Sequence, residues 1–97
     1  MATYIILGNF TEQGVRGVRD TTKRADALRG MASKVGATVK ETYWTLGEFD
    51  VALIVDAPDE ASITALGLSI GALGNVRTQT LRAFGADEMG RILGRMA

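Results

Sequence analysis

Two segments of the chain are apolar at both alternating sets of positions, which predicts two central strands of a sheet covered on both faces. The first segment, residues 3–10, is rich in β-branched and aromatic side chains, which favour strands. The second segment, residues 49–56, has two apolar sets: Val51, Leu53 and Val55 on one face, and Ala52 and Ile54 on the other. We assign the set that contains Val51 to the face that helices cover.

Residues 37–46 and 76–84 contain strand-forming side chains interrupted by polar ones, which is typical of edge strands. Gly47-Glu48 separates the first of these segments from the second central strand, and we expect a two-residue turn there. With that turn, Tyr43 and Trp44 lie on opposite faces, and Tyr43 lies on the face without helices.

Residues between the strands show the period of helices. Thr11 is a suitable N-cap for a short helical turn, which Gly14 and Gly17 weaken. A longer helix is expected over residues 22–35, where apolar side chains recur with the spacing i, i+3, i+4, i+7. Gly36 then stands where a left-handed C-cap is expected.

A second long helix is expected after the stretch Asp56-Ala57-Pro58-Asp59, with Asp56 as its cap and Pro58 at an early helical position. Its apolar stripe is made of Ile63, Leu66, Ile70 and Leu73. A further stripe predicts a helix over residues 87–96, through Met89, Ile92, Leu93 and Met96.

The order strand, helix, strand, turn, strand, helix, strand is the split βαβ pattern. Right-handed crossovers put both long helices on one face of a four-stranded antiparallel sheet whose inner strands are the first and the third. We therefore expect an α+β, ferredoxin-like βαββαβ sandwich with an added C-terminal helix, folded as one domain over residues 1–97.

In this fold the other face of the sheet is uncovered and carries Ala52, Ile54 and Tyr43. The first strand adds one of two sets, which the pattern does not separate: Ile5 and Leu7, or Tyr4, Ile6 and Phe10. Such a patch is large for a monomer, and its burial at about 25 cal/mol per Å² favours association. We expect it to meet the sheet of a second copy, giving at least a dimer, with the C-terminal helix as the competing cover.

Composition narrows the chemistry. The chain has no cysteine and no histidine, which excludes disulfides, thiolate or imidazole metal centres, proximal-histidine haem and imidazole catalysis. No acidic cluster has the spacing of an oxygen-ligated metal site, and we predict neither metal nor cofactor. There is no basic leader and no apolar run of about 18 residues, so we expect a cytoplasmic protein without a membrane partner.

The charge is zero overall but unevenly distributed. Basic side chains predominate in residues 1–40, whereas residues 41–76 contain acidic side chains and no basic ones. Most of the basic stretch belongs to an amphipathic helix, whose outer face is normally charged, and we predict no nucleic-acid partner.

Several stretches resemble the GYD-domain family of small bacterial and archaeal proteins. They are Tyr43 to Asp50 with Val51 to Asp59, Tyr4 to Leu7 with Asn9 to Thr11, and Gly74 to Thr78 with Thr80 to Phe84, and together they span nearly the whole chain. The resemblance implies a dimeric α+β barrel, in which two ferredoxin-like sheets face each other, and implies little about function. The Gly-Tyr-Asp residues of the family name correspond to Gly47, Phe49 and Asp50, so the tyrosine hydroxyl is absent here.

Five polar side chains are candidate ligand-binding residues: Asn9, Tyr43, Asp50, Arg77 and Arg82. Asn9 stands near the end of a central strand, where a buried amide needs partners, and either arginine suits a carboxylate or phosphate. Each also has a structural interpretation: a backbone cap for Asn9, packing for Tyr43, a turn cap for Asp50, and solvation or an interface ion pair for the arginines.

These observations favour a small-molecule binding or regulatory module over an enzyme, with a site between facing sheets for a small acidic or aromatic molecule. The alternatives are a cofactor-independent oxygenase of the dimeric α+β barrel type and a purely structural oligomer. No paired carboxylates, nucleophile–base pair or glycine-rich phosphate loop is visible, and we assign no catalytic residue.

Overall fold

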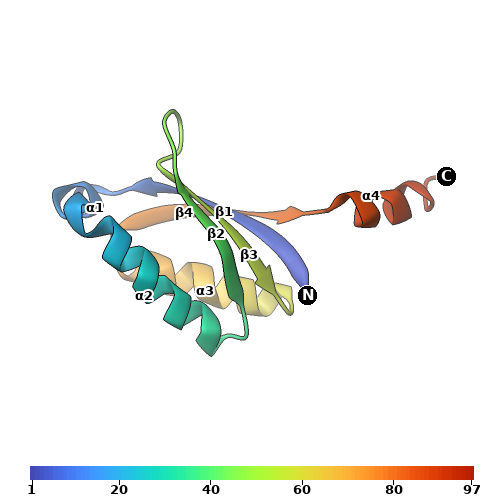
Figure 1. Ribbon diagram of the computed structural model, residues 1–97, viewed down its shortest axis with the longest axis horizontal. Coiled ribbons are helices and arrows are strands. Elements are labelled where there is room, and N and C mark those ends of the chain that lie inside the picture. The colour runs from blue at the N-terminus through green and yellow to red at the C-terminus, as the bar shows by residue number, and fades with distance from the viewer.

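The computed structural model describes all 97 residues and contains one four-stranded antiparallel sheet in the order β2-β3-β1-β4 (Figure 1). The strands are β1 (Ala2–Phe10), β2 (Thr38–Trp44), β3 (Val51–Ala57) and β4 (Val76–Ala83). The α-helices are α1 (Glu12–Arg16), α2 (Thr21–Lys34), α3 (Glu60–Ala72) and α4 (Ala86–Leu93), and a 3₁₀ turn, η1 (Val18–Asp20), joins α1 to α2. The predicted α+β, ferredoxin-like order, with the first and third strands in the middle, is confirmed.

The strand register shows which side chains of β1 face the helices. Tyr4 pairs with Val55 and Ile6 with Leu53, and all four side chains are buried under α2 and α3. Because successive residues of a strand alternate, the other face of β1 carries Ile5, Leu7 and Asn9. The choice that the sequence left open is thus decided, and Val51, Leu53 and Val55 lie on the helix side as predicted.

The core lies between this face of the sheet and the two long helices. From α3 it receives three residues of the predicted stripe, Ile63, Leu66 and Ile70, whereas Leu73 at the end of the helix is exposed. Helix α2 buries only Ala32 fully, with Leu28 and Met31 packed at the margin. The helix that contributes more to the core is therefore α3.

The helix ends follow the predicted chemistry except at the start of α3. Thr11 caps α1 by accepting the backbone N–H of Gly14, and Gly36 after α2 has a φ of 75°, which a glycine adopts without strain. The predictions that Asp56 caps α3 and that Pro58 occupies an early helical position are wrong, since Asp56 is still part of β3 and Pro58 precedes the N-cap. The cap is Asp59, whose carboxylate accepts the backbone N–H of Ser62 at 2.8 Å.

The β2–β3 hairpin has the predicted register, with Tyr43 opposite Ala52 and Trp44 opposite Val51, so these two aromatic side chains lie on opposite faces. The predicted two-residue turn is wrong, because β2 ends at Trp44 and β3 begins only at Val51, which leaves a longer loop over residues 45–50. The regular pairing is also interrupted in β2 between Val39 and Glu41, an irregularity that the polar pattern of this strand does not reveal.

Helix α4 does not cover the open face of the sheet. It continues beyond the end of β4 and projects from the body of the molecule, on the side remote from α1 (Figure 1). The competing cover for the open face is therefore excluded within a single chain. No helix has the length and apolar character needed to cross a membrane.

Candidate functional site

The surface that stands out is the face of the sheet opposite α2 and α3, which we call the open face. Its centre is an apolar group of four half-buried side chains from β1 and β3: Ile5, Leu7, Ala52 and Ile54. Tyr43 and Leu81 extend it onto the two edge strands, and both are exposed. No element of the chain covers this group, so a single copy leaves it in contact with water.

Polar side chains surround the apolar group. Asn9 in β1 is paired in register with Arg77 in β4, which places both at one end of the open face. The two ion pairs of the chain involve other arginines, so the Arg77 guanidinium is free to meet an anion. On the opposite edge, the Tyr43 hydroxyl donates a hydrogen bond to the Glu41 carboxylate. Three of the five candidate residues, Asn9, Tyr43 and Arg77, thus share the open face.

Asp50 has a structural role at the end of the hairpin. Its carboxylate accepts the backbone N–H of Phe10 at 2.9 Å, and its own backbone N–H donates to the Gly8 carbonyl at 2.9 Å. These bonds extend the contact between β1 and β3 beyond the last regular pair. Asp50 therefore fixes the hairpin to the central strand, and its carboxylate is already engaged.

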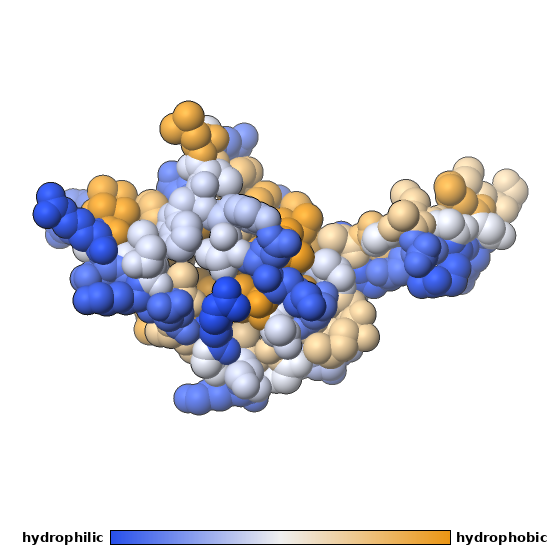
Figure 2. Space-filling view, viewed as in Figure 1, coloured by the Kyte–Doolittle hydropathy of each residue, from blue (hydrophilic) through white to orange (hydrophobic).

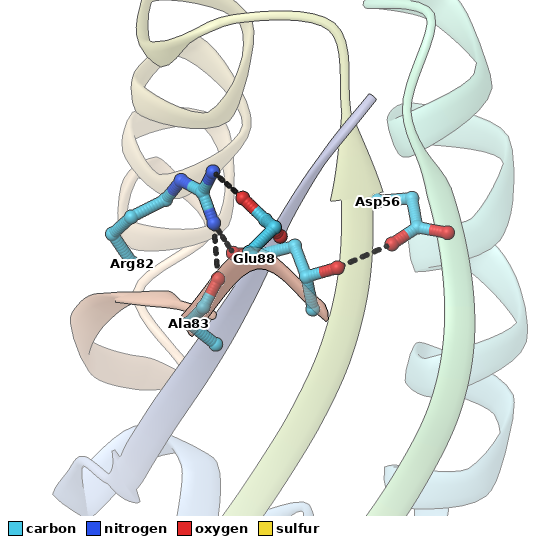
Figure 3. A network of polar contacts seen from close by, with 5 residues as sticks. Asp56, Arg82, Ala83 and Glu88 are labelled. Atoms are coloured by element: carbon cyan, nitrogen blue, oxygen red, sulfur yellow. Dashed lines mark hydrogen bonds and ion pairs between the residues drawn. The ribbon is translucent and has the colours of Figure 1, made fainter. Parts of the chain in front are cut away.

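Arg82 lies on the other face of the sheet, opposite Tyr4 in β1. Its guanidinium donates to Glu88 of α4 at 2.9 Å and to the Ala83 carbonyl (Figure 3). It also stacks on the Phe84 ring, at 4.5 Å from the ring centre. The Arg82 hydrogen bond lowers the pKa of Glu88 from its ordinary value of 4.5. Arg82 and Glu88 therefore form a latch between β4 and α4, remote from Asn9.

The one cavity of the structure lies on the helix side of the sheet, between α2, the end of α3 and the strands. Its lining is mainly apolar, and at one wall the Trp44 indole N–H donates to the Thr21 hydroxyl at 3.0 Å. The volume is about 90 Å³. A cavity that holds benzene measures about 150 Å³, so this one is too small for an aromatic ring without rearrangement.

Sequence reasoning missed the Arg82–Glu88 latch and the Trp44–Thr21 contact. The latch joins a strand to a helix, so neither the two-residue nor the 3.6-residue period relates its members. The contact of Trp44 with Thr21 depends on how α2 packs on the sheet. Neither contact could be predicted from a periodic pattern of residues in the sequence.

Comparison with known proteins agrees with this architecture. The family model described as "GYD domain" matches residues 4–93, which is most of the chain. The chain belongs to the GYD-domain family. In this GYD domain the glycine of the name, Gly47, has a φ of 119° at the exposed hairpin loop, a conformation that favours glycine.

The GYD domain is also similar to individual proteins of Thermus thermophilus. A curated protein named "Glutamine synthetase and cystathionine beta-lyase binding protein" is 29% identical over 84 residues, which cover 86% of this chain and 88% of the relative. The crystal structure of TTHA0845 from the same species matches with a TM-score of 0.58 and 26% identity, covering 89% of this chain and 96% of the other.

Proposed function

We propose that this GYD domain is a self-associating binding module in which the open faces of two copies meet and form a site between them for a small acidic or aromatic molecule. The observation that carries this proposal is the uncovered apolar group of the open face. Large contiguous apolar patches are uncommon on the surfaces of monomers, and covering them is favourable.

The polar rim supports a ligand at the same place. Asn9 offers both hydrogen-bond donors and an acceptor, and Arg77 offers a free guanidinium beside it. A carboxylate bound by Arg77 would leave an attached aromatic group near the apolar centre. The small cavity on the helix side is the less suitable place, because an aromatic ring does not fit its volume.

Association is tested by sedimentation equilibrium of the wild type and Ile54→Lys. Ile54 is on the open face, so lysine there faces water in a monomer but would be buried and unpaired between two sheets. We expect a dimeric wild type and a folded, monomeric Ile54→Lys. Ala27→Lys, on the exposed side of α2, is the matched control and should remain dimeric. A monomeric wild type at high concentration would refute the proposal.

Ligand binding is tested by thermal shift against small carboxylates and aromatic acids. A compound that binds only the folded protein raises its Tm. The shift should be reduced in Arg77→Gln and in Asn9→Ala, while Arg95→Gln, at the far end of the chain, should retain it. If no compound of a broad panel shifts the wild type, the small-molecule part of the proposal is abandoned.

The name of the Thermus relative favours a second candidate, a module that binds an enzyme. Binding of purified glutamine synthetase and cystathionine β-lyase from the source organism, measured by calorimetry, tests it directly. Saturable binding of either enzyme that an open-face variant does not impair would place the partner site on another surface. Absence of binding to both would reject this candidate.

A further inference from the structure

Helix α4 and the residues around it form an arm with an unpartnered apolar stripe. The stripe consists of Met89, Ile92, Leu93 and Met96, whose exposed fractions are 46, 39, 56 and 72%. The opposite side of the arm carries Asp87, Arg91 and Arg95. A helix of only eight residues is marginal in water, because nucleation is costly and tertiary packing normally supplies its stability. The stripe therefore needs a surface to pack on.

The arm is held away from its own domain. The Arg82 guanidinium binds Glu88 in the first turn of α4 (Figure 3). It also lies on the Phe84 ring and donates to the Thr3 carbonyl of β1 at 3.4 Å. These contacts tie the start of the arm to the end of the sheet. Gly85 continues in an extended conformation, so α4 leads outward from β4 instead of folding back.

The stripe faces the side of the molecule on which the open face lies. In the common view of Figures 1 and 2, α2 and α3 lie below the sheet, the charged side of α4 points down and its apolar side points up. The arm thus continues the uncovered side of the sheet beyond the end of β4. A molecule that packs on the open face can therefore contact the stripe as well.

The arm adds apolar area to that of the open face. Four strands about 4.8 Å apart and about seven residues long span roughly 450 Å² in projection, and their side chains make the accessible area larger. A stable interface buries about 800 Å² of accessible surface per partner. A contact by the arm, made twice in a two-fold dimer, increases the area buried by the two sheets.

We infer that the α4 arm of each copy packs its stripe on the second copy in the dimer, and so forms a second part of the interface. This inference rests on the association proposed above. The helix carries Asp87 and Glu88 as well as Arg91, so it lacks the excess of basic residues with which interfacial helices bind anionic lipid. A second copy is therefore the occupant that the charges favour over a membrane.

The test compares Ile92→Gln with Arg91→Gln by sedimentation equilibrium of the full chain. The same residue is introduced at adjacent positions on opposite sides of one helix. Ile92→Gln should raise the dimer dissociation constant by about tenfold or more, because each dimer loses the side chain twice, and Arg91→Gln should change it less than about threefold. Leu93→Gln should repeat the effect of Ile92→Gln. Circular dichroism checks that each variant is folded, which is expected since the stripe is outside the core.

The outcomes separate the two proposals. A dimeric wild type whose dissociation constant is unchanged in both Ile92→Gln and Leu93→Gln would overturn the arm contact and leave the sheet pairing intact. A monomeric wild type would overturn both. Binding of the monomer to vesicles of anionic phospholipid, lost in Ile92→Gln, would assign the stripe to a membrane and also overturn the arm contact.

Discussion

At the scale of single residues, Gly8 in β1 lies against side chains of both flanking strands. A Cβ added there would lie 2.6 Å from a Val76 methyl and 2.8 Å from a Val51 methyl, and neither β-branched side chain moves easily. Gly8 thus lets the two flanking strands fill the helix side of the sheet at this point. The sequence does not reveal this role, because in the apolar run of residues 3–10 a glycine appears only as a missing side chain.

Gly8→Ala is expected to destabilise the protein by about 1–3 kcal/mol through overpacking. Gly30→Ala is the matched control, because its Cβ would meet nothing within 4 Å on the outer side of α2. There the same substitution should stabilise by about 0.5–1 kcal/mol, since alanine is the better helix former. Urea unfolding of the two variants measures both effects, and equal signs would contradict the packing account.

Asp59 is the residue that begins α3. Its hydrogen bond from the backbone N–H of Ser62 lowers its pKa from the ordinary value of 3.8. Because the folded-state pKa is depressed, the cap stabilises fully above the unfolded-state value and loses its effect as the pH falls through the folded-state value.

Asp59→Ala should lower the Tm by a few degrees at pH 7, and the difference from wild type should shrink at strongly acidic pH. Asp59→Ser keeps a capping oxygen and should retain most of the stability at both pH values. Scanning calorimetry at the two pH values checks this. A pH-independent loss would show that Asp59 acts other than through its ionised carboxylate.

At the scale of elements, α2 and α3 are held to the sheet in different ways, and only the apolar stripe of α3 predicts its contacts well. The stripe of α3 is regular, and three of its four members are in the core. Helix α2 instead depends partly on polar contacts: Arg24 donates to the carbonyls of Gly14 and Gly17, and Arg29 to that of Val39. Part of the basic stretch thus serves to attach α2 to its neighbours.

The orientation of α4 is predicted to depend on the Arg82–Glu88 latch. Glu88→Gln should increase the hydrogen exchange of α4 amides at neutral pH while the amides of β1 keep their protection. As the pH falls through the lowered pKa of Glu88, the protection factors of the α4 amides in the wild type, which correct for slower intrinsic exchange at acidic pH, should fall in the same way. Glu12→Gln, which removes an exposed ion pair in α1, is the control and should leave α4 unchanged. Equal exchange in all three proteins would contradict the latch.

At the scale of the whole molecule, the sheet has one covered and one uncovered face, and the arm extends the molecule to 50 Å along its longest axis. A single chain therefore leaves two apolar surfaces, the open face and the stripe of the arm, exposed to water on the same side. This asymmetry motivates the proposed association more strongly than any single residue does.

If the open faces pair, the Tm of the wild type should rise with protein concentration, because dissociation accompanies unfolding. The Tm of Ile54→Lys should be independent of concentration. Thermal unfolding followed by circular dichroism over a hundredfold range of concentration measures this. A wild-type Tm that does not vary would count against a dimer in that range.

The sequence by itself determined the order of elements, the inner and outer strands, the hairpin register and the face to which Tyr43 and Trp44 point. These features follow from local periods, so Val51, Leu53 and Val55 identify the covered face without any knowledge of tertiary contacts. Only the tertiary structure decided that Ile5 and Leu7 lie on the open face, that Asp59 caps α3, and that α4 projects outward. The first depends on the pairing of residues distant in the chain, such as Tyr4 with Val55. The cap depends on where β3 ends, and the position of α4 on the contact of Arg82 with Glu88, and neither follows a strand or helix period.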